Sequence, residues 1–202
     1  MKKITLLYLA LLLSFTGFAQ FTEGFESTAG PDALPSTNWT LGSGNWAVFD
    51  NGVGLAQRWK INTTAANVHG GTNAAYVQNE NIGINNTSED YLATPLITVP
   101  ANGQLHFWTR TVQSGDQGTK YHVKVNTVNG TQTTAANYTT VQQWTETSLV
   151  TTYNVYEEKV VDLTAYAGQQ VYIAFMMTFT QPSASLGGDR WLIDDVNLVQ
   201  QC

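Results

Sequence analysis

The chain has 202 residues and a formal net charge of −6 at pH 7, with 9 Lys and Arg against 15 Asp and Glu. It therefore lacks the basic surface that neutralises phosphates, which excludes nucleic acid as a main partner, and anionic membranes should repel it. The single cysteine, Cys202, permits no intrachain disulfide and argues against a thiol nucleophile.

Residues 1–19 have the pattern of an export signal. Two lysines precede an apolar run that extends to Leu13, and Gly17-Phe18-Ala19 places small residues at the two positions that a signal peptidase inspects. A membrane anchor would need about 20 apolar residues, and this run is shorter. We therefore expect the mature chain to begin at Gln20 and to be secreted or held at the cell surface. Residues 20–202 would form a single domain with no membrane insertion.

Short alternating runs separated by Gly, Asn, Thr and Pro recur along the mature region, and no helical apolar period lasts beyond two turns. The chain is therefore predicted to be all-β, a β-sandwich of two antiparallel sheets. In chain order, weaker strands are expected at residues 46–50, 58–62 and 74–78. Clearer strands are expected at 91–99, 104–112, 120–128, 156–163, 171–179 and 190–199.

Three of these segments also indicate their place in the sandwich. Pro95 and Pro100 bracket residues 96–99 and limit that part to an edge or a strand end, because proline cannot donate to a ladder. In 120–128, apolar residues that should face inward alternate with His122 and a lysine, which should face water. Segment 171–179 is apolar on both faces, as expected for a central strand covered on both sides. Residues 164–168 close with Gly and are expected to form one helical turn or a tight bend between two strands.

The last expected strand carries two adjacent carboxylates within an apolar run. Asp194 and Asp195 must point to opposite faces of a strand, and Asp195 should share the inward face of Ile193. A buried carboxylate needs a partner. Because basic residues are few, a bound cation is a more natural partner than a salt bridge, and hard oxygen ligands favour calcium (Ca2+).

Five groups of short motifs along the chain resemble one known family. They are Gly24-Phe25-Glu26, Asp90-Tyr91-Leu92-Ala93-Thr94-Pro95-Leu96, Leu105-His106-Phe107-Trp108, Val161-Asp162-Leu163 with Tyr166-Ala167-Gly168-Gln169, and Gly188-Asp189-Arg190-Trp191-Leu192-Ile193-Asp194-Asp195-Val196. Together, over about residues 21–199, they resemble the choice-of-anchor J, or cleaved adhesin, domain. The resemblance implies a jelly-roll β-sandwich related in architecture to MAM domains. It also implies a non-catalytic module that binds structural calcium and serves adhesion or substrate attachment.

The resemblance further suggests calcium ligands. Glu26 matches the acidic position after the family's initial Gly-Phe, and Asp194 and Asp195 match its terminal pair. Asp50, in a turn with Asn51 and Gly52, is a further oxygen donor. The first and last strands of a jelly roll can lie side by side, so Glu26 and Asp195 could meet. Calcium takes about six to eight oxygens, so carbonyls or waters would complete the site. In the competing interpretation, one aspartate accepts backbone N–H bonds and Glu26 is solvated.

The chain carries no recognisable catalytic motif. It has no Gly-x-Ser-x-Gly elbow, no His-Glu-x-x-His and no glycine-rich phosphate loop, and its three histidines stand in different segments, so we expect no enzyme activity. The expected ligand is an extracellular protein or a glycan. A carbohydrate-binding module in the narrow sense is the first alternative, and a secreted hydrolase the second.

Trp144 is the best candidate for a ligand-binding surface aromatic, because it lies in the polar stretch 139–147 near the expected loop 131–140. The opposing argument is that a sandwich needs aromatic residues in its core, where tryptophans are usually buried. Trp108 and Trp191 are assigned to that core. The other aromatics in or near loops are Trp39, Trp46, Trp59, Tyr138 and Tyr153.

Overall fold

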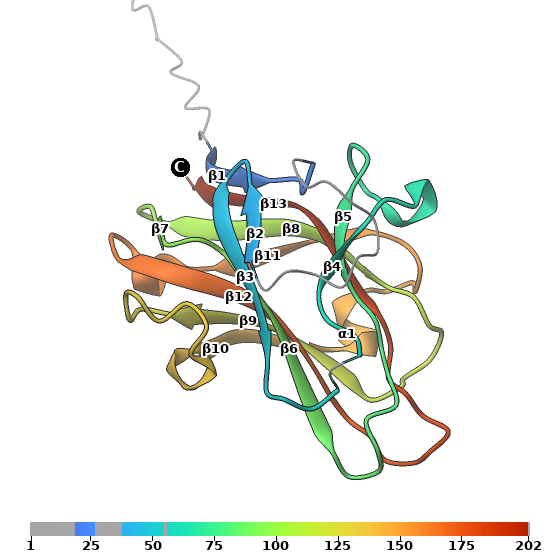
Figure 1. Cartoon of the computed structure of the whole chain (residues 1–202). Helices are drawn as coiled ribbons and strands as arrows, with labels where there is room; N and C mark the ends of the chain where they lie inside the picture. The colour runs from blue at the N-terminus through green and yellow to red at the C-terminus, as the bar shows by residue number, and fades with distance from the viewer. Residues whose placement is uncertain (1–18, 27–37, 55, 202) are drawn as a thin grey trace, which may run out of the picture.

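The computed structural model describes residues 19–26, 38–54 and 56–201 (Figure 1). The expected export signal lies outside these residues except for Ala19, which begins the first strand. The strands are β1 (Ala19–Glu23), β2 (Asn38–Leu41), β3 (Gly44–Asp50), β4 (Lys60–Asn62), β5 (Ala74–Val77), β6 (Thr87–Ala93), β7 (Ile97–Thr98), β8 (Gly103–Thr111), β9 (Thr119–Asn126), β10 (Thr139–Thr145), β11 (Glu157–Asp162), β12 (Gln170–Thr180) and β13 (Trp191–Gln200). The helical pieces are α1 (Glu146–Leu149) and the 3-10 turns Ala65–Asn67, Ala135–Asn137 and Thr164–Tyr166.

The strands form two antiparallel sheets, which confirms the predicted all-β sandwich (Figure 1). One sheet has the order β11-β8-β13-β5-β4, with β1 also paired to β13. The other has the order β10-β9-β12-β6-β3-β2, with β7 also paired to β12. The pairing of β1 with β13 places the first and last strands side by side, as expected, and brings Glu23 opposite Val196.

Aromatic side chains fill the space between the two sheets. Trp46, Trp59 and Trp191 are fully buried there. The rings of Trp59 and Trp191 lie 5.3 Å apart, and those of Phe107 and Phe175 meet edge to face at 5.0 Å. Tilted and edge-to-face contacts of this kind add to the free energy of burying the rings, so they fix how the two sheets pack.

A second, smaller cluster covers the outer face of the seven-stranded sheet. Tyr172 and Met176 of β12 pack there with Tyr91 and with Tyr138, whose hydroxyl donates to the Gln132 carbonyl at 2.7 Å. The predicted coverage of β12 on both sides is thus confirmed. The segment predicted to be a loop at 131–140 in fact packs against this outer face and continues into β10.

Three sequence expectations about the sheets need correction. Pro95 divides the expected strand 91–99, because β6 ends at Ala93 and β7 begins at Ile97. The edge strand β10 was not predicted, because its Thr- and Gln-rich sequence alternates only weakly. The expectation that His122 faces water is wrong: the residue is 7% exposed and lies between neighbours on β10 and β12.

Burial gives His122 a measurable effect on stability. Burial, together with the nearby charges of Lys124 and Lys120, lowers the pKa of His122 from 6.5 to about 4. Between pH 6.5 and pH 4, His122 is therefore protonated in the unfolded chain but largely neutral in the folded chain. We expect the free energy of unfolding to fall by about 3 kcal/mol between pH 6.5 and pH 4 from this group.

Urea unfolding of wild type and His122→Leu across this pH range measures the effect. The variant should lose less stability than the wild type as the pH falls. The same pH dependence in both proteins would contradict the assignment.

Candidate functional site

Strand β13 contains a bulge at its two aspartates. Its register with β8 shifts between Asp194 and Asn197, and Asp195 has a φ of +46°. The extra residue lets both Ile193 and Val196 face the core. Asp194 is then fully buried, whereas the Asp195 side chain is 37% exposed. The expectation that Asp195 shares the inward face of Ile193 is therefore wrong, because it assumed an unbroken strand.

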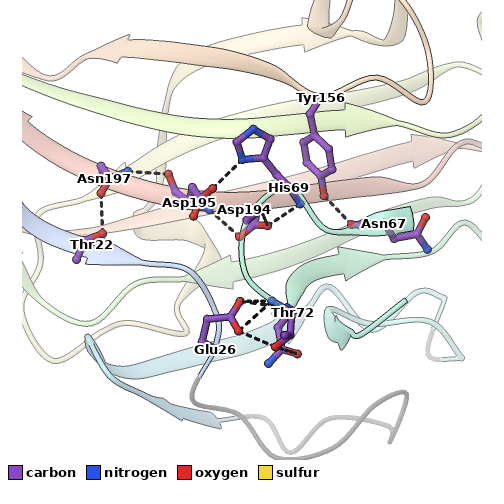
Figure 2. Close-up of polar contacts among 11 residues, drawn as sticks. Thr22, Glu26, Asn67, His69, Thr72, Tyr156, Asp194, Asp195 and Asn197 are labelled. Carbon is purple, nitrogen blue, oxygen red and sulfur yellow. Dashed lines mark hydrogen bonds and ion pairs between the residues drawn. The ribbon is translucent and has the colours of Figure 1, made fainter. Parts of the chain in front are cut away.

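The buried carboxylate of Asp194 binds the loop that leads into β5 (Figure 2). Its Oδ2 accepts backbone N–H bonds from His69 at 2.9 Å and Gly70 at 3.1 Å, and its Oδ1 accepts from Asp195 at 2.8 Å. Burial raises the pKa of Asp194 to about 6, although these three bonds favour the ionised form and limit the rise. The carboxylate thus anchors the loop, as the competing interpretation of the sequence held for one of the aspartates.

Asp195, Trp108 and Tyr156 hold the side chain of His69, and Figure 2 shows Asp195 and Tyr156 beside it. Its Nδ1 lies 2.7 Å from Asp195 Oδ2, and its ring stacks on Trp108 with centroids 3.9 Å apart. Tyr156 meets the same ring edge-on at 5.3 Å and donates its hydroxyl hydrogen to the Asn67 carbonyl at 2.8 Å. Trp108 is therefore half-buried on an outer face, and its assignment to the core is wrong.

Glu26 fixes the other end of the loop (Figure 2). Its carboxylate accepts bonds from the Thr72 N–H at 3.0 and 3.1 Å, the Thr72 hydroxyl at 2.7 Å and the Asn73 N–H at 3.1 Å. Burial acts to raise the pKa of Glu26, but these bonds outweigh it and lower the pKa below its usual value. The side-chain amide of Asn73 donates in turn to the Phe25 carbonyl at 3.0 Å.

Two glycines allow the carboxylates to approach the loop backbone. A Cβ on Gly70 would lie 2.6 Å from Asp195 Oδ2, and a Cβ on Gly71, whose φ is +65°, would overlap the Glu26 carboxylate. The other oxygen of Asp195 faces Gly24, which precedes the Phe25-Glu26 turn. Sequence reasoning missed the 69–73 loop, and the run His-Gly-Gly-Thr-Asn directly before a strand was the available signal.

The structure does not bring Asp50 to the other three acidic residues. Its Oδ2 lies 2.9 Å from Arg58 Nε, an ion pair without an aligned hydrogen bond, and its Oδ1 accepts the Gly52 N–H at 2.8 Å. Across the described ranges, no three His, Cys, Asp or Glu side chains converge closely enough to hold a metal ion by themselves. A cation beside Glu26 and Asp195 would therefore need backbone carbonyls and waters as well.

Trp144 offers only part of its ring to solvent, because it packs edge-on against Phe107 with centroids 6.1 Å apart. Among the other loop aromatics, Tyr153 is 52% exposed, while Trp39, Trp46, Trp59 and Tyr138 are buried. Tyr153 also borders a surface cavity of about 160 Å³, which no sequence pattern indicated. The cavity is lined by Thr111, Gln113, Gly115, Glu146, Thr147, Val150, Thr151 and Tyr153.

Comparison with known proteins identifies the family. The model of the Cleaved Adhesin Domain matches residues 36–197. The chain belongs to the cleaved adhesin domain family. It is 34% identical over 155 residues to Hemagglutinin A of Porphyromonas gingivalis (strain ATCC BAA-308 / W83), a match that covers 67% of this chain and 7% of the relative. The chain thus spans only a small part of that relative's length.

Solved structures confirm the expected fold. The K2 cleaved adhesin domain of Lys-gingipain superposes with a TM-score of 0.59 at 23% identity, covering 90% of this chain and 98% of that one. A structure titled for carbohydrate-binding modules of the β-sandwich superfamily gives a TM-score of 0.53 at 10% identity, covering 77% and 57%. In the part of this cleaved adhesin domain that the structure describes, α1 has four residues and no helix could span a bilayer.

Removing the Asp194 carboxylate should destabilise the domain. In Asp194→Ala, three backbone N–H groups lose a charged acceptor at a fully buried position, so we expect a loss of about 3 kcal/mol in the free energy of unfolding.

Urea unfolding at pH 7.5 measures this loss, with Asp162→Ala as the control. Asp162 is exposed and accepts a single backbone bond, from Thr164 at 2.8 Å, so its replacement should matter far less. Similar losses in the two variants would contradict the role given to Asp194.

Proposed function

We propose that this domain is an exported, non-catalytic module that binds an extracellular protein or a glycan. Its membership of the cleaved adhesin domain family over residues 36–197 is the observation that carries this proposal. The similarity to a relative named Hemagglutinin A also supports an adhesive role. In this reading the two packed sheets form a rigid support, and the loops at their ends present the ligand-binding surface.

We further propose that calcium stabilises the junction of β1, β13 and the 69–73 loop. The donor chemistry supports it: Glu26 and Asp195 supply hard carboxylate oxygens on either side of Gly70 and Gly71, and carbonyls of this glycine-rich loop could add neutral oxygens. Asp194 would orient the loop through its backbone bonds. When bound, the ion would neutralise the carboxylates of Glu26 and Asp195 in a chain that has few basic residues to pair with them.

Calcium should raise the melting temperature of the domain. An ion that binds only the folded state adds about 2.7 kcal/mol to the free energy of unfolding at one hundred times its dissociation constant. Glu26→Gln and Asp195→Asn should each reduce the response, because they remove carboxylate charge and keep the side-chain size.

The comparison is thermal unfolding with calcium and with EDTA, and Asp162→Asn is the matched control. An undiminished calcium response in both Glu26→Gln and Asp195→Asn would reject this site.

The cavity beside Tyr153 favours a glycan as the ligand. It combines one exposed aromatic face with Thr hydroxyls and the Gln113 amide, the mixture of apolar and hydrogen-bonding groups that orients a small polar ligand. Glu146 also lines it; burial raises the pKa of this carboxyl, while backbone bonds from Gln117 and Thr119 oppose the rise. Trp144, two residues earlier, is the second aromatic that could contribute.

A glycan array and an extracellular-protein array, each probed with the purified domain, separate the ligand classes. For a glycan hit, Tyr153→Ala should weaken binding about tenfold, or about 1.4 kcal/mol, because the aromatic face is lost. Ile84→Ala, at a similarly exposed apolar residue in another loop, is the control. Trp144→Ala tests the neighbouring ring. Equal effects of Tyr153→Ala and Ile84→Ala would exclude this cavity as the binding site.

A further inference from the structure

A small, partly open cavity lies between the loops that follow β5 and precede β13. Its volume is about 10 Å³, enough for one water-sized occupant. Three acidic residues line it, Glu80, Asp90 and Asp189, together with Gln78 and Asn79. This cavity is separate from the junction of Glu26 and Asp195, whose hydrogen-bond partners come from the 69–73 loop.

One carboxylate oxygen of Asp90 is buried without a hydrogen-bond partner among the described residues. Asp90 lies in β6 and is 5% exposed, and this oxygen is its Oδ1. The nearby guanidinium of Arg58 lies against Asp50 instead, at 2.9 Å. Taking a carboxylate out of water without compensation is costly, so a group in this position calls for a compensating ligand.

Asp189 presents a second unpartnered oxygen. It is 0% exposed, and its Oδ1 accepts backbone N–H bonds from Val112, Gln113 and Arg190 at 3.2, 2.8 and 2.6 Å. These bonds fix the carboxylate, but its buried Oδ2 has no partner in the described part of the chain. Two separate elements, β6 and the segment before β13, thus each bring a buried carboxylate oxygen without a hydrogen-bond partner to residues that line one cavity.

The third acidic residue of the lining, Glu80, is already engaged, because it accepts the Ala56 N–H at 3.1 Å. Arg190 does not line the cavity; its positive charge acts on Asp189, and its Nε lies 3.5 Å from the Asn79 side-chain oxygen. A water molecule in the cavity would supply hydrogen bonds but no positive charge. A cation would compensate the two carboxylates, and neutral amide oxygens lie in the same lining.

We propose that this cavity is a calcium site, held by the carboxylates of Asp90 and Asp189 and completed by neutral oxygens of Gln78, Asn79 or the backbone. All these donors are hard oxygens in an irregular arrangement, which suits calcium. Magnesium usually keeps several of its own waters, so a site built from protein oxygens favours calcium. The ion would tie β6 to the loop before β13.

This loop already bonds to the loop between β5 and β6. The Gln181 side-chain oxygen accepts the N–H groups of Ile82 and Gly83 at 2.8 and 2.9 Å, and its carbonyl accepts that of Asn85 at 2.8 Å. Figure 1 shows both loops extending together from the same end of the sandwich. An ion between Asp90 and Asp189 would fasten the base of this loop pair.

Equilibrium dialysis of the full chain against calcium, after removal of metal with EGTA, tests the site. The decisive protein is Asp195→Asn, in which the junction site is weakened: it should still bind one calcium per chain. Asp90→Asn in that background should abolish this binding, and Asp116→Asn, the same change at an exposed carboxylate, should not. Asp189→Asn replaces Asp90→Asn if the latter fails to fold by circular dichroism.

Terbium gives a second readout of the same site. Trp59 Nε1 donates to the Asp90 carbonyl at 3.0 Å, so terbium bound in this cavity should emit on tryptophan excitation. In Asp195→Asn, calcium should displace the bound terbium and so remove this emission. The emission should be absent when Asp90→Asn is added to Asp195→Asn. No calcium bound to Asp195→Asn, or equal binding with and without Asp90→Asn, would overturn the proposal. If the wild type binds one calcium ion and only Asp195→Asn removes it, the junction site is supported and the site at Asp90 and Asp189 is rejected.

Discussion

The buried carboxylate of Asp194 is the interaction on which the arrangement of the candidate junction depends. It sits at a bulge in the last strand and accepts N–H groups from a loop more than a hundred residues away in the chain. These bonds place His69 beside Asp195 and fix the first end of the 69–73 loop, whose other end is bound by Glu26. The pairing of β1 with β13 supplies the other constraint, because it places the Phe25-Glu26 turn beside the same bulge.

The same use of carboxylates recurs elsewhere in this acidic domain. Glu23 accepts the N–H groups of Phe25 and Ser43, and Glu146 accepts those of Gln117 and Thr119. Backbone N–H groups in loops can stabilise a carboxylate without a basic side chain, so a chain with few Lys and Arg can still bury acids. Asp90 stands apart from this pattern, because its buried Oδ1 has no partner among the described residues.

Sequence periodicity predicted the strands whose two faces differ or are both strongly apolar, such as β9 and β12. Periodicity failed where pairing with strands distant in the sequence determines the orientation or burial of a residue. The bulge that separates Asp194 from Asp195 depends on pairing with β8, and the burial of His122 depends on neighbouring strands. Likewise, the turn at Asp50 offered suitable oxygens, but strand topology gave Asp50 a different set of neighbours. Local pattern therefore drew attention to Asp194 and Asp195, and the family resemblance to Glu26, but neither predicted the loop that joins them.

The central claim is that the Asp194 and Glu26 carboxylates hold the 69–73 loop through its backbone. Amide hydrogen exchange, followed residue by residue by NMR, measures this most directly. The N–H groups of His69, Gly70, Thr72 and Asn73 should exchange far more slowly than those of exposed loop residues, and Asp194→Ala should release the first two. Exchange of His69 and Gly70 at the rate of an unprotected loop in the wild type would contradict the account.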